Sequence, residues 1–181
     1  LTAFGVMDFK GGLIARTGYT GEDGFEFIVP RDVGIEIWNK AIELGIAPIG
    51  LAARDSLRLE AGLNLYGNDM DENYHPFESG LGWTIDFSNA ERKFIGRGAL
   101  ERIDSKTSKK ITGVILKDRG VLRPGYRLQS NSGEGVILSG TFSPILQKSI
   151  ALARVDSCMK DEAVVIIREK EFSVDLVSSR F

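Results

Sequence analysis

Glu26 is the first residue whose type and place could do chemistry. It stands between Phe25 and Phe27 in an alternating segment. In an extended strand its side chain therefore points to the face opposite the two aromatic rings. A carboxylate on that face can accept hydrogen bonds from a polar ligand. The alternative is an ordinary solvated strand face, which the same alternation also predicts.

A second candidate, Arg54, lies on a predicted helix over residues 51–61 that ends before Gly62. Arg54 and Arg58 are one helical turn apart, so they project from the same face. The guanidinium of Arg54 could bind a polar ligand. Its other interpretation is a surface or interdomain charge pair with Asp55, which would add little to stability.

The loop over residues 18–24 has a glycine at every third position. It contains Glu22 and Asp23 and no lysine, which makes it a poor cradle for phosphate. Taken alone, the loop predicts a hairpin connection.

The sequence contains few of the cysteine and histidine residues that zinc sites and disulfides need. The chain has one cysteine, Cys158, and one histidine, His75. An internal disulfide is therefore excluded, and no spacing predicts a zinc site. A single cysteine favours a reducing compartment, and we expect a cytoplasmic protein, or a mitochondrial matrix protein in a eukaryote.

Charge and hydropathy exclude other classes. The 181 residues carry 23 Lys and Arg against 25 Asp and Glu, a formal charge of −2. This balance predicts no general attraction to nucleic acid or anionic membrane. No apolar run approaches the roughly 20 residues that a membrane-spanning helix needs.

The elements that must position the candidates differ along the chain. Short strands are predicted over 12–17 and 25–29, followed by a helix over 33–44 with Asp32 as its N-cap. Residues 94–103 predict a short helical or extended connector. The polar segment 104–110 is the best domain boundary. Beyond it, six short strands predict a small antiparallel barrel or sandwich. They span 111–116, 126–129, 135–139, 149–155, 163–168 and 172–177.

Several blocks together resemble the glycine-cleavage T-protein family. They follow the family's order and approximate spacing and cover nearly the whole chain. The blocks are Arg16-Thr17-Gly18-Tyr19-Thr20-Gly21-Glu22-Asp23-Gly24-Phe25-Glu26, the run from Gly50 to Leu63, Tyr66-Gly67, Gly80-Leu81-Gly82-Trp83, Phe94-Ile95-Gly96-Arg97, the run from Ser139 to Pro144, and Ile150-Ala151-Leu152-Ala153.

The resemblance implies an α+β fold, with fragments of two α+β domains of the folate-binding T-protein fold followed by a small antiparallel β-barrel. Residues 1–48 would be the C-terminal part of the first folate-binding domain. Residues 49–106 would be part of the second α+β domain, and 107–181 the C-terminal barrel domain. Because incomplete domains expose apolar surface, self-association of the chain is also expected.

The resemblance also implies an activity. Family members are tetrahydrofolate-dependent aminomethyltransferases of the glycine cleavage system. They move the methylene of aminomethyl-lipoyl H-protein to tetrahydrofolate and release ammonia. The implied partners are the lipoyl-carrying H-protein and tetrahydrofolate, the latter as substrate. No metal, nucleic acid or membrane is implied.

Four residues match folate-site positions of the family. Glu26 matches the glutamate that holds the pterin edge, since a carboxylate can accept two parallel hydrogen bonds from a ring N–H and an amino group. Arg54 matches a folate-site arginine, whose fixed fork suits a planar ligand rich in acceptors. Tyr19 and Tyr66 match tyrosines near the ligand, each offering a flat apolar face and a polar tip.

The sequence departs from the family in three places. The family's catalytic aspartate belongs to an N-terminal half that is not seen here, and no acid in 69–72 replaces it by motif. Leu1 suggests a cut through a longer chain. We therefore expect no catalytic residue in this chain and no activity from it alone. Asn73-Tyr74-His75 replaces a more usual acidic and aliphatic stretch, and Ser178-Ser179-Arg180-Phe181 replaces a Pro-Phe pair.

Two alternatives stay open. The chain could be the folate-binding domain of a related demethylase or of a dimethylglycine- or sarcosine-oxidising enzyme. It could also be a binding module with no catalytic role.

Overall fold

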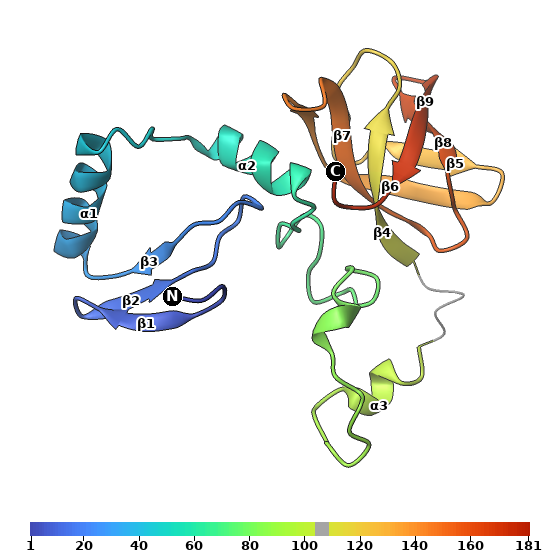
Figure 1. The fold of residues 1–181 in the computed structure, drawn as a ribbon. Helices are drawn as coiled ribbons and strands as arrows, with labels where there is room; N and C mark the ends of the chain where they lie inside the picture. Colours follow the sequence, from blue (N-terminus) through green and yellow to red (C-terminus); the bar gives the residue numbers. More distant parts are fainter. Residues whose placement is uncertain (104–108) are drawn as a thin grey trace. The chain divides into compact units, whose positions relative to one another are not determined.

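The computed structural model describes residues 1–103 and 109–181. The described chain divides into two compact parts, residues 1–58 and 59–181, and each is described here by itself (Figure 1). Of the predicted polar boundary, residues 104–108 lie outside the described residues, whereas Lys109 and Lys110 open a strand. The division at 48 and 106 stays a prediction.

The first part contains a three-stranded antiparallel sheet in the order β1-β2-β3. The strands are β1 (Val6–Phe9), β2 (Gly12–Ala15) and β3 (Glu26–Ile28). Lys10 and Gly11, both with positive φ, connect β1 to β2 in a two-residue turn, the geometry that matches the twist of paired strands. Strand β1 was not predicted, because its residues are mostly exposed and carry no buried alternation.

Helix α1 (Arg31–Glu43) follows β3. The prediction of Asp32 as its N-cap was wrong. Pro30 takes the cap position, and its carbonyl accepts the amide of Gly34, so Asp32 lies inside the first turn, where its charge complements the helix dipole. At the other end the predicted stop is confirmed. Gly45 has φ +78°, and the amides of Gly45 and Ile46 bond back to the carbonyls of the last turn, as in a Schellman motif.

Helix α2 (Leu51–Glu60) ends before Gly62, as predicted. Gly62 has φ +72°, and a Cβ there would lie 2.3 Å from the carbonyl oxygen of Ser179. The amide of Phe181 donates to the carbonyl of Glu60 at 3.1 Å. The tail of the chain therefore packs against residues 60–62, and only glycine allows this approach at that conformation.

The second part is dominated by a closed antiparallel barrel in the order β4-β7-β6-β5-β8-β9 (Figure 1). Pairing of the first and last strands closes it. This confirms the predicted α+β fold with a small antiparallel barrel and decides for the barrel over the sandwich. The strands are β4 (Lys109–Leu116), β5 (Arg127–Ser130), β6 (Gly133–Ser143), β7 (Lys148–Asp156), β8 (Glu162–Ile167) and β9 (Lys170–Val177).

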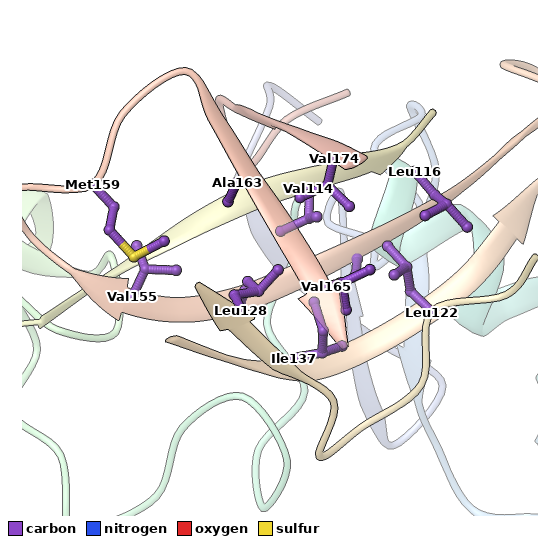
Figure 2. Packing of buried hydrophobic residues seen from close by; sticks show 12 residues of the cluster. Val114, Leu116, Leu122, Leu128, Ile137, Val155, Met159, Ala163, Val165 and Val174 are labelled. Atoms are coloured by element: carbon purple, nitrogen blue, oxygen red, sulfur yellow. The ribbon is translucent and has the colours of Figure 1, made fainter. Parts of the chain in front are cut away.

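The barrel interior holds the main apolar core (Figure 2). Alternating side chains of every strand enter it, as period-two patterning requires. Its large members are fully or almost fully buried: Val114, Leu116, Leu122, Leu128, Ile137, Val155, Met159, Val165 and Val174.

Strand β7 is buried on both faces. Ala151, Ala153 and Val155 belong to the interior core. On the outer face, Ile150 and Leu152 pack in a second cluster with Leu59. This explains the nearly continuous apolar run of β7, because a strand covered on both sides loses the polar half of its alternation. The outer-face cluster packs the barrel against Leu59, in the last turn of α2.

The remaining elements between α2 and the barrel are short. They are η1 (Gly82–Thr84) and α3 (Arg97–Leu100). The predicted connector over 94–103 thus contains one helical turn. No helix in the part of the chain that the structure describes is both long and apolar enough to cross a membrane.

Candidate functional site

The glycine-containing loop joins β2 to β3, so the predicted hairpin connection is confirmed. An ion pair closes the loop. Arg16 Nε donates to Asp23 Oδ1 at 2.8 Å, and Arg16 Nη2 donates to Asp23 Oδ2 at 2.7 Å. This is the bidentate geometry of a strong arginine–carboxylate pair. The hydrogen bonds from Arg16 hold the pKa of the Asp23 carboxyl below its ordinary value. Asp23 thus helps to hold the shape of the loop.

Glu26 is the first residue of β3 and is exposed. The hydroxyl of Thr17 donates to Glu26 Oε2 at 2.5 Å. Phe25 and Phe27, in contrast, line a hollow of about 610 Å³ with α1, and Glu26 is not among the residues that line it. The carboxylate of Glu26 and the rings of its two aromatic neighbours therefore lie on opposite faces of the strand, as the alternation predicted. Thr17 is a contact that sequence reasoning missed.

Arg54, in the first turn of α2, comes together with Tyr19 from the loop. The guanidinium carbon lies 4.7 Å from the centre of the Tyr19 ring. A guanidinium stacked on an aromatic face is held in one plane while its N–H groups stay available at the edge. Arg58, one turn later, is buried and bonds Asp55 at 2.7 Å. The acidic neighbour Asp55 therefore has an ion-pair partner in Arg58.

Tyr66 belongs to the second compact part. Its side chain is 65% exposed, and its hydroxyl donates to Glu72 Oε2 at 2.5 Å. This hydrogen bond is the main cause that raises the pKa of Tyr66, and it lowers the pKa of Glu72. The ring is thus presented to solvent with its polar tip already oriented.

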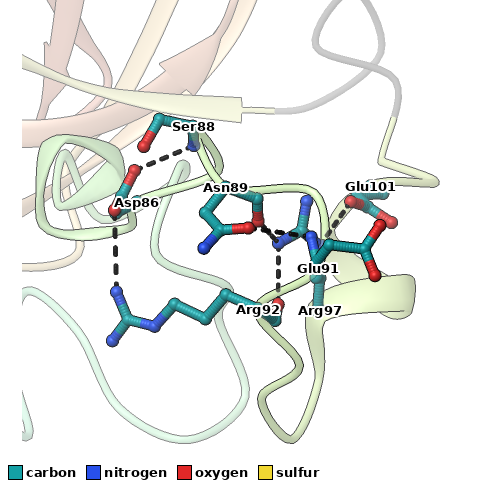
Figure 3. Close-up of polar contacts among 7 residues, drawn as sticks. All are labelled: Asp86, Ser88, Asn89, Glu91, Arg92, Arg97 and Glu101. Carbon is teal, nitrogen blue, oxygen red and sulfur yellow. Dashed lines mark hydrogen bonds and ion pairs between the residues drawn. The ribbon is translucent and has the colours of Figure 1, made fainter.

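The run 94–97, one of the blocks that resemble the family, has a structural role in this molecule. Figure 3 shows Arg97 at the centre of the loop over 86–101. Its Nη1 donates to the carbonyls of Asn89 (2.7 Å) and Arg92 (2.8 Å), and its Nε donates to Glu101 (2.7 Å). The guanidinium also lies near the rings of Phe87 and Phe94. Arg97 is therefore the residue that holds this loop in shape.

The first part thus presents three groups that suit recognition of a flat polar ligand. Glu26 supplies hydrogen-bond acceptors, Arg54 supplies donors in a fixed plane, and Tyr19 supplies an aromatic face. Among residues 1–103 and 109–181, no group of three or more His, Cys, Asp or Glu side chains could hold a metal ion.

Two family models match the chain. The GCVT N-terminal domain matches residues 5–89. The glycine cleavage T-protein C-terminal barrel domain matches residues 109–181, the range of the closed barrel.

Curated relatives and a solved structure agree with these matches. The chain is 49% identical over 169 residues to an aminomethyltransferase of Xylella fastidiosa (strain M23), covering 93% of this chain and 46% of the relative. It is 48% identical over 169 residues to an aminomethyltransferase of Stenotrophomonas maltophilia (strain K279a), covering 93% and 45%. The crystal structure of glycine cleavage system aminomethyltransferase T from Bartonella henselae matches with a TM-score of 0.86 and 32% identity, covering 95% of this chain and 50% of that one. The chain spans about half the length of these relatives.

Proposed function

This chain belongs to the glycine cleavage T-protein family, and we propose that it carries the folate-recognition part of a tetrahydrofolate-dependent aminomethyltransferase. The whole protein would move the methylene of aminomethyl-lipoyl H-protein to tetrahydrofolate, release ammonia and leave the reduced lipoyl carrier. Because the chain spans about half the length of the matched relatives, the activity is proposed for the whole protein. A cytoplasmic place of action is part of the same proposal.

The observation that carries the proposal is the contact between Arg54 and Tyr19 at 4.7 Å. It joins two sequence blocks more than thirty positions apart, both of them blocks that resemble the family. Glu26 lies at the end of the same loop that carries Tyr19. A donor, an acceptor and an aromatic face on neighbouring segments of one compact part are the groups that a pterin ring needs.

Each residue has a distinct task in this proposal. The carboxylate of Glu26 accepts hydrogen bonds from the pterin edge and replaces the water that would otherwise solvate that edge. Arg54 donates from its fork, and its stacking on Tyr19 fixes the plane of that fork. Tyr19 and Tyr66 are each proposed to offer the ligand an apolar ring face. None of the four is proposed to move a proton or form a bond.

The reacting step is assigned elsewhere in the protein. The aspartate that would help N5 of folate attack the methylene carbon is proposed to lie in the portion outside this chain. The 181-residue chain alone should therefore bind without turning over. In the full-length protein, binding by Glu26 and Arg54 would hold N5 where that carboxylate can act, which is catalysis by positioning.

The test compares the full-length protein with the chain alone. Each is incubated with aminomethyl-lipoyl H-protein, with and without tetrahydrofolate, and ammonia and methylene-tetrahydrofolate are measured. We expect equal amounts of both products from the full-length protein, only when tetrahydrofolate is present, and no turnover by the chain alone. Ammonia release independent of tetrahydrofolate, or full turnover by the chain alone, would refute the assignment.

A further inference from the structure

Asp69 is a fully buried carboxylate only three positions after the exposed Tyr66. Its Oδ2 accepts the backbone amide of Leu65 at 2.8 Å, and its own amide donates back to the Leu65 carbonyl at 2.8 Å. The amide of Gly67 donates to the carbonyl of Met70 at 2.8 Å. The turn over residues 65–70, which presents Tyr66, is thus closed around the Asp69 side chain.

The same residue is fastened to the barrel. Ser139 of β6 donates to Asp69 Oδ1 at 2.6 Å, and Arg154 Nη2 of β7 donates to the Asp69 carbonyl at 2.8 Å. Ser139 and Arg154 are both buried. Hydrogen bonds that involve an ionised group and are shielded from water are the stronger kind. The barrel therefore holds the turn through Asp69.

A β-bulge makes the serine available. The pairing of β6 with β7 shifts at Leu138, so that Ile137 opposes Ala153 but Ser139 opposes Leu152. Ala153 lies in the interior core and Leu152 in the outer-face cluster. Residues directly opposite each other share a face. The extra residue therefore turns Ser139 to the outside of the barrel, where Asp69 lies, as bulges commonly re-aim side chains.

Burial of the Arg154 guanidinium in the barrel wall carries a desolvation cost. Arg154 is 4% exposed, and its Nε has no hydrogen-bond partner among the described residues. Its guanidinium carbon lies 3.3 Å from the centre of the Tyr74 ring, so it also holds the far end of the same segment. An apolar side chain would serve barrel stability as well or better. Both of these contacts instead hold the segment that contains Tyr66 and Tyr74.

We propose that Asp69 is a positioning residue for Tyr66, through which Ser139 and Arg154 of the barrel set the position of a tyrosine ring that contacts tetrahydrofolate. The proposal rests on the proposed function, because it takes Tyr66 as a contact of tetrahydrofolate. It gives the C-terminal barrel an indirect role in ligand binding, through the turn that carries Tyr66.

The test is a double-mutant cycle in the full-length protein, read by calorimetric titration with tetrahydrofolate. The variants are Asp69→Ala, Tyr66→Ala and the pair. In the wild-type background we expect Asp69→Ala to raise Kd about tenfold, equivalent to about 1.4 kcal/mol. In the Tyr66→Ala background it should change Kd less than about twofold, because the residue it positions is gone. Equal effects in the two backgrounds, or no effect in either, would overturn the proposal.

A pair of smaller substitutions distinguishes a specific effect on binding from general destabilisation of the protein. Ser139→Ala removes one bond to Asp69, whereas Ser143→Ala removes a bond from the same strand to Glu60. Both serines are buried, and Ser143→Ala also removes the bond that the Leu146 amide donates to Ser143, so the control perturbs the buried barrel wall as well. Only Ser139→Ala should weaken folate binding. If Ser143→Ala weakens it equally, the effect is general destabilisation and the proposal is wrong. If the wild-type protein binds no tetrahydrofolate at all, the proposed function itself fails.

Discussion

Replacement of Glu26 by glutamine tests the folate site at its central acceptor. The substitution keeps size and shape but exchanges one acceptor oxygen for an NH₂ donor and removes the charge. Glu26 Oε2 already accepts the hydroxyl of Thr17 at 2.5 Å. In the variant, either that hydroxyl reverses its role or the amide oxygen turns toward it. In both cases the ligand loses one acceptor and the charge-assisted character of the other.

The expected loss of affinity follows from the hydrogen bond between the Glu26 carboxylate and the pterin edge. Hydrogen bonds to charged groups contribute roughly 1.5–3 kcal/mol each. Loss of one such bond to the pterin edge therefore weakens affinity about ten- to hundredfold. The apo protein should be almost unaffected, because Glu26 is exposed and surface substitutions usually change stability by less than about 0.5 kcal/mol.

The assay measures Kd for tetrahydrofolate and the apo melting temperature of the full-length protein in parallel. Glu36→Gln is the matched control, since Glu36 is an exposed glutamate of helix α1 that pairs with Lys10 of the β1–β2 turn at 3.3 Å. It should leave both quantities unchanged. An unchanged Kd for Glu26→Gln, together with a large fall in melting temperature, would mean that Glu26 supports the loop through Thr17 and does not bind folate.

Three further changes have defined outcomes. Arg54→Lys should weaken tetrahydrofolate binding without lowering the melting temperature, because an ammonium cannot reproduce the fork that stacks on Tyr19. The control is Arg92→Lys, at an exposed arginine that pairs with Asp86, and equal effects of the two changes would contradict the assignment. Glu72→Gln should lower the pKa of Tyr66 toward its ordinary value, seen by ultraviolet titration, since the Glu72 carboxylate is what raises it. In the wild-type protein, the stability that the Tyr66–Glu72 bond contributes should be lost as the pH falls through the lowered pKa of Glu72, below 4.5. It should also be lost as the pH rises through the raised pKa of Tyr66, above 10.0. If the variant and the wild-type protein have the same stability at both extremes and at neutral pH, the bond contributes nothing. Leu128→Ala should destabilise the barrel by about 2–5 kcal/mol by leaving a cavity in its core, measured by thermal and urea unfolding, whereas Ile145→Ala, at a residue 77% exposed, should stay within about 0.5 kcal/mol.

Local patterns predicted most of the secondary structure because they report a periodicity that burial imposes. Each barrel strand was predicted to within a few residues, since alternating apolar positions fill the interior. The failures have physical causes. Strand β1 is mostly exposed and so has no buried face to alternate. The N-cap at Asp32 was displaced because Pro30 fits the cap position without a side-chain bond.

The candidate site was predictable only in part. The alternation around Glu26 predicted which way its carboxylate points, and the resemblance brought Arg54 and Tyr19 into one hypothesis. Their contact at 4.7 Å needs the loop and helix α2 to meet in space, which no local pattern encodes. Thr17, the hydroxyl that bonds Glu26, lay inside a recognised block but had no signal of its own.

The anchoring of Tyr66 shows why a local pattern can mislead about function. Asp69 bonds residues 70 and 85 positions away, so its neighbours in sequence contain no trace of its partners. Strict alternation along β6 would also put Ser139 on the same face as Ile137, inside the barrel. The one-residue bulge at Leu138 reverses that assignment. A hydroxyl that sequence periodicity assigns to an apolar core, where it would lack a partner, instead reaches a buried carboxylate on the outer face. The irregularity in the strand is therefore what connects the barrel to the turn that carries Tyr66.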